Sequence, residues 1–134
     1  MIILIVEDDK PGRILMERYL EEYGRCDSAE DGKEGLELYN RSVERDEVYD
    51  LAILDIMLPS MDGQEILRRI RESEKNRGVR PTEYTKVIMT TALGDPKNIV
   101  KAFNEGGADS YLVKPVEKET LERELVKLGL NSYE

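Results

Sequence analysis

Residues 51–63, LAILDIMLPSMDG, join an apolar run to an aspartate and a set of turn residues. The first four residues are apolar, which is typical of a short buried strand. Asp55 ends this strand, and Pro59 and the Asp62–Gly63 pair follow it as signals for a turn and a helix start. The stretch therefore predicts a strand with a carboxylate at its carboxyl end and a helix after the turn.

Further apolar runs and helical patterns flank this stretch. The run at 2–6 is rich in β-branched residues, as expected for a strand covered on both faces of a parallel sheet. The other predicted strands span 25–29, 87–89 and 111–113, and the predicted helices span 11–23, 32–39, 64–76, 96–105 and 121–128. Strands and helices that alternate in this way form right-handed crossovers. We therefore predict an α/β fold, a doubly wound, flavodoxin-like (βα)5 three-layer sandwich with a five-stranded parallel sheet.

Length and charge limit the kind of protein this chain can be. Its 134 residues suit one domain, so we expect a single domain over 1–134. Asp and Glu outnumber Lys and Arg by 29 to 20, and the net charge of −9 argues against direct binding to nucleic acid. No window approaches the roughly 20 apolar residues of a membrane span. Cys26 is the single cysteine, so we expect a cytoplasmic protein without disulfides, in which this thiol is a small buried or half-buried residue rather than a nucleophile.

Polar residues follow several of the predicted strands. In a doubly wound fold the binding crevice lies at the carboxyl ends of the strands, where we find Glu7, Asp8, Asp9, Asp55, Thr90, Thr91 and Lys114. Clustered carboxylates repel one another unless they are protonated or bound to a cation. Because the chain has no histidine, oxygen ligands and Mg²⁺ are the expected combination. The pattern predicts a Mg²⁺ site that handles a phosphoryl group, with the Asp55 carboxylate as the attacking group.

Four motifs in this order resemble the receiver domain of two-component response regulators. They are VEDD at 6–9, LDIMLP at 54–59 with DG at 62–63, TA at 91–92 and YLVKP at 111–115. The resemblance implies that a histidine kinase or histidine phosphotransfer protein donates a phosphoryl group and that Mg²⁺ is needed. It also implies a switch that alters the surface presented to an unknown downstream protein, and it allows a dimer that forms on phosphorylation. Such a domain is no general enzyme, because it catalyses only its own phosphorylation and dephosphorylation.

The resemblance also assigns roles within the predicted site. Glu7 and Asp8 correspond to the acidic pair that holds the metal, with Asp8 as a direct ligand. Asp55 corresponds to the phosphoacceptor, which becomes a 4-aspartylphosphate and also contacts the metal. The backbone carbonyl of Met57 corresponds to the third protein ligand. Lys114 corresponds to the lysine that contacts the phosphoryl group.

The remaining assignments concern the switch and its surroundings. Thr91 corresponds to the catalytic and switch threonine because it directly precedes Ala92, so Thr90 should point elsewhere. Tyr111 corresponds to the aromatic residue whose rotamer follows the switch, although plain core packing is an alternative. Asp9 falls one place beyond the acidic pair and should cap the next helix. The resemblance also implies a cis peptide bond between Lys114 and Pro115.

Other functions for an aspartate at a strand end fit less well. A haloacid-dehalogenase-like phosphatase places a second aspartate two residues after its nucleophile, where this chain has Met57. A flavodoxin-like electron carrier needs a Ser/Thr/Gly-rich phosphate loop after the first strand, where this chain has three acidic residues at 7–9. A receiver-like domain that only binds partners would lack Asp8, Asp55 or Lys114.

Two stretches of the chain are longer than the family pattern, and the end of the chain is compatible with two interpretations. The stretch 74–85 is longer than usual and is expected to be an ordinary surface loop, and the turn at 106–109 is one residue longer. The end of the chain shortly after the last predicted helix favours a single-domain regulator. The alternative is a receiver cut from a longer regulator with an absent effector domain. The cognate kinase, the downstream target and the oligomeric state are not encoded in any recognisable motif.

Apolar residues flank the path that a hydrolytic water would take. In receivers this path runs between the side chains two places after the phosphoacceptor and two places after the threonine, here Met57 and Leu93. Neither side chain can orient a water by a hydrogen bond. We therefore predict a long-lived aspartyl phosphate.

Overall fold

The computed structural model describes residues 1–92 and 107–130. Within these residues, five parallel strands form one sheet in the order β2-β1-β3-β4-β5. The strands are β1 (Ile2–Val6), β2 (Arg25–Ala29), β3 (Leu51–Asp55), β4 (Lys86–Thr91) and β5 (Ser110–Val113). The helices of the same part are α1 (Lys10–Leu20), α2 (Gly32–Glu44), α3 (Gly63–Asn76) and α5 (Lys118–Lys127), with a 3-10 turn at Pro81–Glu83.

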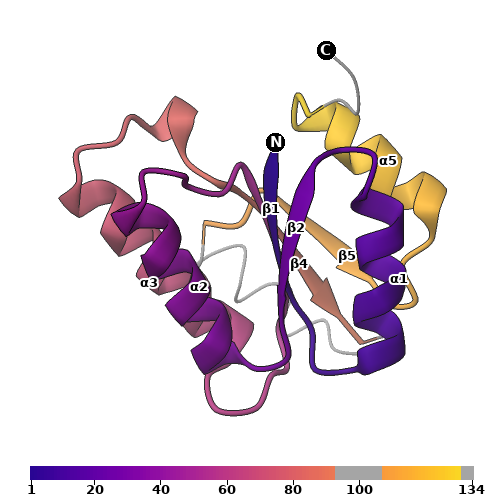
Figure 1. Cartoon of the computed structure of the whole chain (residues 1–134). Coiled ribbons are helices and arrows are strands. Elements are labelled where there is room, and N and C mark those ends of the chain that lie inside the picture. Colours follow the sequence, from indigo (N-terminus) through magenta and orange to yellow (C-terminus); the bar gives the residue numbers. More distant parts are fainter. Residues whose placement is uncertain (93–106, 131–134) are drawn as a thin grey trace.

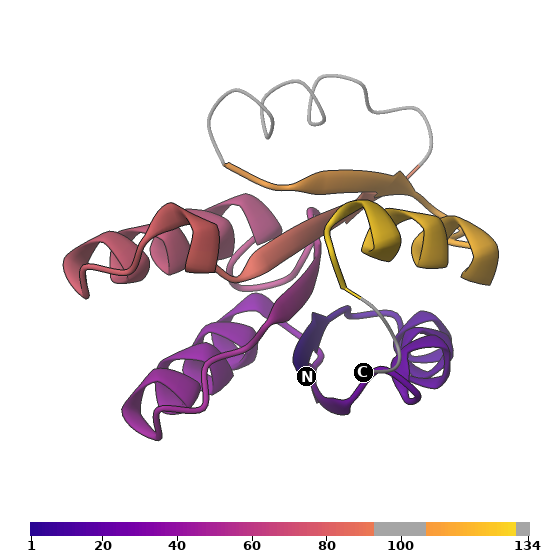
Figure 2. The ribbon, with the colours of Figure 1, turned by 90° about the horizontal axis from the view of Figure 1, so that it is seen from above.

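The sheet is the middle layer of three. Figure 1 and the view from above in Figure 2 show α2 and α3 on one face of the sheet and α1 and α5 on the other. Residues of one strand alternate between the two faces, so Ala52 and Leu54 pack on the α2–α3 side while Leu51 and Ile53 pack on the α1–α5 side. All five residues of β3 are buried. This confirms the predicted doubly wound α/β fold.

Most predicted elements lie where the apolar patterns placed them, and their ends differ by a few residues. The strands at 2–6 and 25–29 have the predicted bounds, while β4 and α2 are longer than predicted. Helix α1 ends at Leu20 instead of Tyr23, because the Tyr23 amide bonds to the Leu20 carbonyl in a turn. The predicted helix at 96–105 and Leu93 lie outside the described residues.

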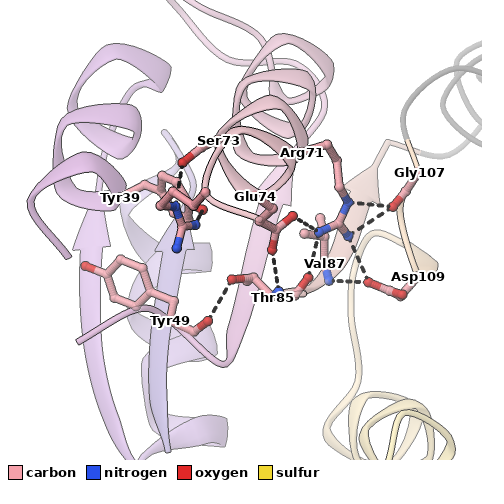
Figure 3. A network of polar contacts seen from close by, with 10 residues as sticks. Tyr39, Tyr49, Arg71, Ser73, Glu74, Thr85, Val87, Gly107 and Asp109 are labelled. Carbon is pink, nitrogen blue, oxygen red and sulfur yellow. Dashed lines mark hydrogen bonds and ion pairs between the residues drawn. The ribbon is translucent and has the colours of Figure 1, made fainter. Parts of the chain in front are cut away.

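The stretch 74–85 is only partly the surface loop that we expected. Its middle is exposed, but its two ends, Glu74 and Thr85, are buried. The Glu74 carboxylate accepts a hydrogen bond of 2.6 Å from the Thr85 amide and one of 2.7 Å from Arg71 (Figure 3). The Thr85 hydroxyl donates to the carbonyl of Tyr49 at 2.7 Å. The extra residues are therefore anchored at both ends, since a buried carboxylate needs hydrogen-bond donors.

Candidate functional site

Three carboxylates meet at the carboxyl ends of β1 and β3. The pairing of Val6 with Leu54 places the residues that follow β1 beside Asp55 at the end of β3. One carboxylate oxygen from each of Glu7, Asp8 and Asp55 lies within 4.8 Å of the others. Glu7 and Asp55 are buried, at 9% and 4% exposure, whereas Asp8 is exposed. The structure therefore brings together the three carboxylates that the sequence predicted.

Lys114 reaches into this cluster from the end of β5. Its ammonium lies 2.5 Å from Oδ2 of Asp55 and 2.6 Å from Oε1 of Glu7. The Lys114–Pro115 bond is cis, as predicted. The Lys114 amide donates to the carbonyl of Thr91 at 2.8 Å, which extends the pairing of β4 and β5. Three carboxylates against one ammonium leave an excess of negative charge, which can attract a divalent cation.

Burial and ion pairing shift the pKa values of Glu7 and Lys114 in opposite directions. Burial raises the pKa of Glu7, and the neighbouring Asp55 raises it further, although the hydrogen bond from Lys114 opposes this. Burial acts to lower the pKa of Lys114, but the hydrogen bonds to Asp55 and Glu7 outweigh it and raise the value overall. The ammonium is therefore held in its charged form by the two carboxylates that it contacts.

Met57 holds Asp55 through its backbone. The Met57 amide donates to Oδ1 of Asp55 at 3.0 Å, while Lys114 contacts the other oxygen. The two oxygens of the Asp55 carboxylate thus have different partners, which defines its orientation. The Met57 side chain is 63% exposed. This amide contact was not predicted from the sequence, because no side-chain pattern reveals it.

The two threonines of β4 lie on opposite faces of the sheet. Thr91 is buried at the end of the strand, and its hydroxyl lies 3.4 Å from the carbonyl oxygen of Ala92. Thr90 pairs with Asp55 across β3 and β4 and lines the same cavity as Glu7 and Lys114. We expected Thr90 to point elsewhere, so its place beside the cluster is a difference. Its cause is the side-chain alternation of the strand, which sends neighbouring residues to opposite faces.

Tyr111 packs against the core on the α2–α3 side of the sheet. Its hydroxyl is buried, and burial raises the pKa of Tyr111 to about 12. It pairs with Met89, two residues before Thr91, so Tyr111 and Thr91 are diagonal neighbours on one face. The position suits both core packing and a switch, and the switch role stays a prediction.

A cavity of about 320 Å³ lies next to the carboxylate cluster, between α1 and the residues that follow β5. Its polar lining includes Glu7, Thr90 and Lys114. Its apolar lining is Leu15, Met16, Tyr19, Pro115 and Val116. This cavity was not predicted from the sequence, because its lining combines residues of α1 with residues about a hundred positions later in the chain. It offers apolar surface beside the carboxylate cluster.

Asp9 and Cys26 have the structural roles expected from the sequence. Asp9 caps α1, since its carboxylate accepts a hydrogen bond of 3.0 Å from the Gly12 amide, as predicted. Cys26 is half-buried, and burial raises the pKa of its thiol to about 11. A thiol with such a pKa is a poor nucleophile at neutral pH, because little thiolate is present.

In the stretches 1–92 and 107–130, no helix combines the length and apolar character that crossing a membrane would require.

Comparisons with known proteins identify the family of this chain. Residues 3–126 match the family model of the response regulator receiver domain. Transcriptional regulatory protein ResD of Bacillus subtilis is 40% identical over 114 residues, which cover 84% of this chain and 41% of that protein. Transcriptional regulatory protein AfsQ1 of Streptomyces coelicolor is 37% identical over 121 residues, which cover 90% of this chain and 47% of that protein. The chain thus spans less than half the length of these curated relatives.

The fold is also found among solved structures. A response regulator receiver domain protein from Clostridium thermocellum superimposes with a TM-score of 0.78 at 27% identity, covering 95% of this chain and 92% of that one. The fold, the acidic cluster at the strand ends and the family match over 3–126 agree with one another. The chain belongs to the family of response regulator receiver domains, the phosphorylation-controlled signalling domains of two-component systems.

Proposed function

We propose that Asp55 of this receiver accepts a phosphoryl group from a histidine kinase or a histidine phosphotransfer protein, in a Mg²⁺-dependent reaction. We also propose that the whole chain, 1–134, acts as one receiver domain. One observation carries the proposal: the carboxylates of Glu7, Asp8 and Asp55 converge within 4.8 Å, and Lys114 contacts Asp55 at 2.5 Å. A buried aspartate between an acidic pair and an ammonium suits the transfer of a charged group.

The donor set fits Mg²⁺. Carboxylate oxygens are hard ligands, and their excess negative charge needs a cation. Glu7, Asp8 and Asp55 would hold the ion, with the Met57 carbonyl as a further ligand. When bound, the ion supplies neutralisation of charge on the transferring phosphoryl oxygens.

The chain's own residues account for the rest of the transfer. An oxygen of the Asp55 carboxylate forms a bond to phosphorus while the bond from phosphorus to the donor's imidazole nitrogen breaks. The nitrogen keeps the electron pair of that bond and takes up a proton. The Met57 amide orients Asp55 during the attack. The Lys114 ammonium, now on Oδ2 of Asp55, can follow the charge onto a phosphoryl oxygen.

A switch would carry the signal to a partner. Thr91 has a long contact of 3.4 Å to the Ala92 carbonyl, so its hydroxyl can exchange that contact for a phosphoryl oxygen. Tyr111 lies diagonally across β4 and β5 from it and would respond to the movement. The partner surface would then serve an unidentified downstream protein or a second phosphorylated copy in the cytoplasm. The net charge of −9 supports a protein partner over direct contact with nucleic acid.

Labelling with a small phosphodonor tests the proposal. Acetyl phosphate and Mg²⁺ should add one phosphoryl group to the chain, as measured by intact mass. Asp55→Asn should abolish the addition, because an amide is a poor nucleophile. Asp9→Asn is the matched control: it also removes one negative charge beside the cluster, yet asparagine still caps α1 and labelling should persist. Undiminished labelling of Asp55→Asn would remove Asp55 from its role.

A further inference from the structure

The loop that follows Asp55 caps the helix α2. The Gly32 amide at the start of α2 donates to the carbonyl of Pro59 at 3.2 Å. The next amide, Lys33, donates to the hydroxyl of Ser60 at 3.1 Å. The two amides that follow bond to Asp31, one to its side chain and one to its carbonyl. The first amides of a helix have no partner within the helix, and here the loop supplies the acceptors for two of them, Gly32 and Lys33.

Ser60 occupies this place under backbone strain. Its φ of 65° lies in the left-handed region, which is unfavourable for a residue other than glycine. Such a conformation persists only where surrounding contacts hold it. Besides accepting from Lys33, the Ser60 hydroxyl lies 3.4 Å from the Asp31 carboxylate. A Cβ atom on Gly32 would lie 1.6 Å from the carbonyl oxygen of Met61, so the loop and α2 are in direct backbone contact.

The base of the same loop is part of the phosphorylation site. The Ile56 amide bonds to the Thr90 carbonyl, and the Gly63 amide closes the loop onto the Ile56 carbonyl at 3.0 Å. Met57 lies between this closed base and the tip at Ser60. The backbone of Met57 therefore has little freedom while both the base and the tip are bonded.

We propose that Ser60 is a positioning residue for the metal and phosphoryl site. By capping α2 from the loop, it holds the loop tip and so the backbone of Met57. The Met57 amide orients Asp55, and its carbonyl would be the further metal ligand. This inference rests on the proposed function, because it assigns Ser60 to the same site.

Three variants at one position test the role. Ser60→Ala removes the hydroxyl and leaves the strain, whereas Ser60→Gly removes both and keeps the test available if the alanine variant fails to fold. Ser60→Asn is the rescue, because asparagine tolerates the left-handed region and its side-chain oxygen can accept from Lys33. Ser28→Ala is the control, since it removes a comparable side-chain hydrogen bond, to Glu17 of α1, the helix on the opposite face of the sheet from α2.

Two measurements separate positioning from plain stability. Hydrogen exchange of the Lys33 amide reports the cap in metal-free protein, and calorimetric titration reports the Kd for Mg²⁺. We expect Ser60→Ala and Ser60→Gly to speed the exchange and to weaken Mg²⁺ binding by about fivefold, the scale of one lost hydrogen bond. Ser60→Asn should restore both values, and Ser28→Ala should change neither.

The possible failures are distinguishable. If the wild-type protein binds no Mg²⁺, both the proposed function and the role of Ser60 are wrong. If the wild type binds Mg²⁺ and both hydroxyl-free variants bind it equally tightly, the positioning role is overturned and the proposed function stands. Faster Lys33 exchange with an unchanged Kd would likewise overturn the role.

Discussion

Two groups of charged side chains lie at opposite ends of the sheet, and they differ in how their charges are satisfied. At the carboxyl ends of the strands, the acidic cluster sets three carboxylates against the ammonium of Lys114. At the amino ends of β4 and β5, Arg71 joins two carboxylates and two backbone segments, as Figure 3 shows. We call this second group the Arg71 cluster; its members are Arg71, Glu74, Thr85, Val87, Gly107 and Asp109.

The Arg71 cluster finds its partners within the backbone. The guanidinium of Arg71 donates to the carbonyls of Gly107 and Thr85 as well as to both carboxylates. Glu74 accepts from the Thr85 amide, and Asp109 accepts from the Val87 amide at 2.8 Å. Arg71 also lies over the ring of Tyr84, 5.3 Å from its centre. Charges satisfied in this way hold segments of chain together and leave no capacity for a ligand.

The acidic cluster has a larger excess of negative charge. Three carboxylates lie around one ammonium, compared with two carboxylates around one guanidinium in the Arg71 cluster, and Asp8 is exposed to solvent. We infer that a larger excess of like charge indicates a cation-binding site, whereas charges that are hydrogen-bonded to backbone groups of several segments indicate a structural role. The two clusters should therefore respond differently to substitution and to Mg²⁺.

The largest expected effect is a loss of stability from the Arg71 cluster. Glu74→Ala leaves the buried Thr85 amide without its acceptor and removes one of the two carboxylates that pair with Arg71, so we expect the free energy of unfolding to fall by about 3 kcal/mol. Urea denaturation measures the change, and the Kd for Mg²⁺ should stay the same. The control is Glu72→Ala, which removes an exposed ion pair with Arg68 and should cost less than about 1 kcal/mol. Equal losses in both variants would contradict a special role for the buried carboxylate.

A change beside the acidic cluster should alter a rate and leave stability alone. Met57→Asn places a hydrogen-bonding side chain on the predicted path of the hydrolytic water. We expect hydrolysis of the aspartyl phosphate to accelerate by roughly 5–30-fold, or about 1–2 kcal/mol in the barrier. Because Met57 is 63% exposed, the unfolding free energy should hardly change. Val126→Asn, at a site 65% exposed on α5, is the control and should hydrolyse at the wild-type rate.

Mg²⁺ should stabilise the protein only through the acidic cluster. At a concentration ten times the Kd, the ion should add about 1.4 kcal/mol to the unfolding free energy. Thermal denaturation with and without the ion measures this increment. Asp8→Asn should abolish the increment, since it removes one of the three converging carboxylates. Asp109→Asn makes the same exchange in the Arg71 cluster, so it should lower the stability of the metal-free protein and keep the Mg²⁺ increment. Loss of the increment in Asp109→Asn would contradict the prediction that Mg²⁺ acts only through the acidic cluster.

The smallest effect should be a gain in the metal-free protein. Without the ion, Asp8→Asn relieves repulsion from Glu7 and Asp55, so the unfolding free energy should rise slightly. The rise should be smaller than the Mg²⁺ increment because Asp8 is exposed and solvent screens its charge. Denaturation at low and high salt checks this, since salt should remove the gain. If Asp8→Asn instead lowered the unfolding free energy at low salt, Asp8 would be a stabilising residue and the prediction would be wrong.

The predicted and the missed contacts differ in whether a local sequence pattern marks the residues that make them, since both kinds join residues far apart in the sequence. Glu7, Asp8 and Asp55 could be placed together because each directly follows an apolar strand, and the carboxyl ends of parallel strands share one edge. The Arg71 cluster gave no such signal, since Arg71 and Asp109 are 38 residues apart and neither belongs to a recognisable motif. The contact of Ser60 with Lys33 spans 27 residues and was missed for the same reason.

The sequence by itself determined the order of strands and helices and the identity of the acidic residues. Both are local properties, since apolar periodicity reflects the side chains of one element. Only the tertiary structure decided which face Thr90 takes, which carbonyls Arg71 reaches and which loop caps α2. These contacts depend on how the parallel strands are paired and on the path of the connections between them. Hydrogen bonds to the backbone across such distances leave no pattern in the side chains, because every residue carries the same carbonyl and almost every one the same amide.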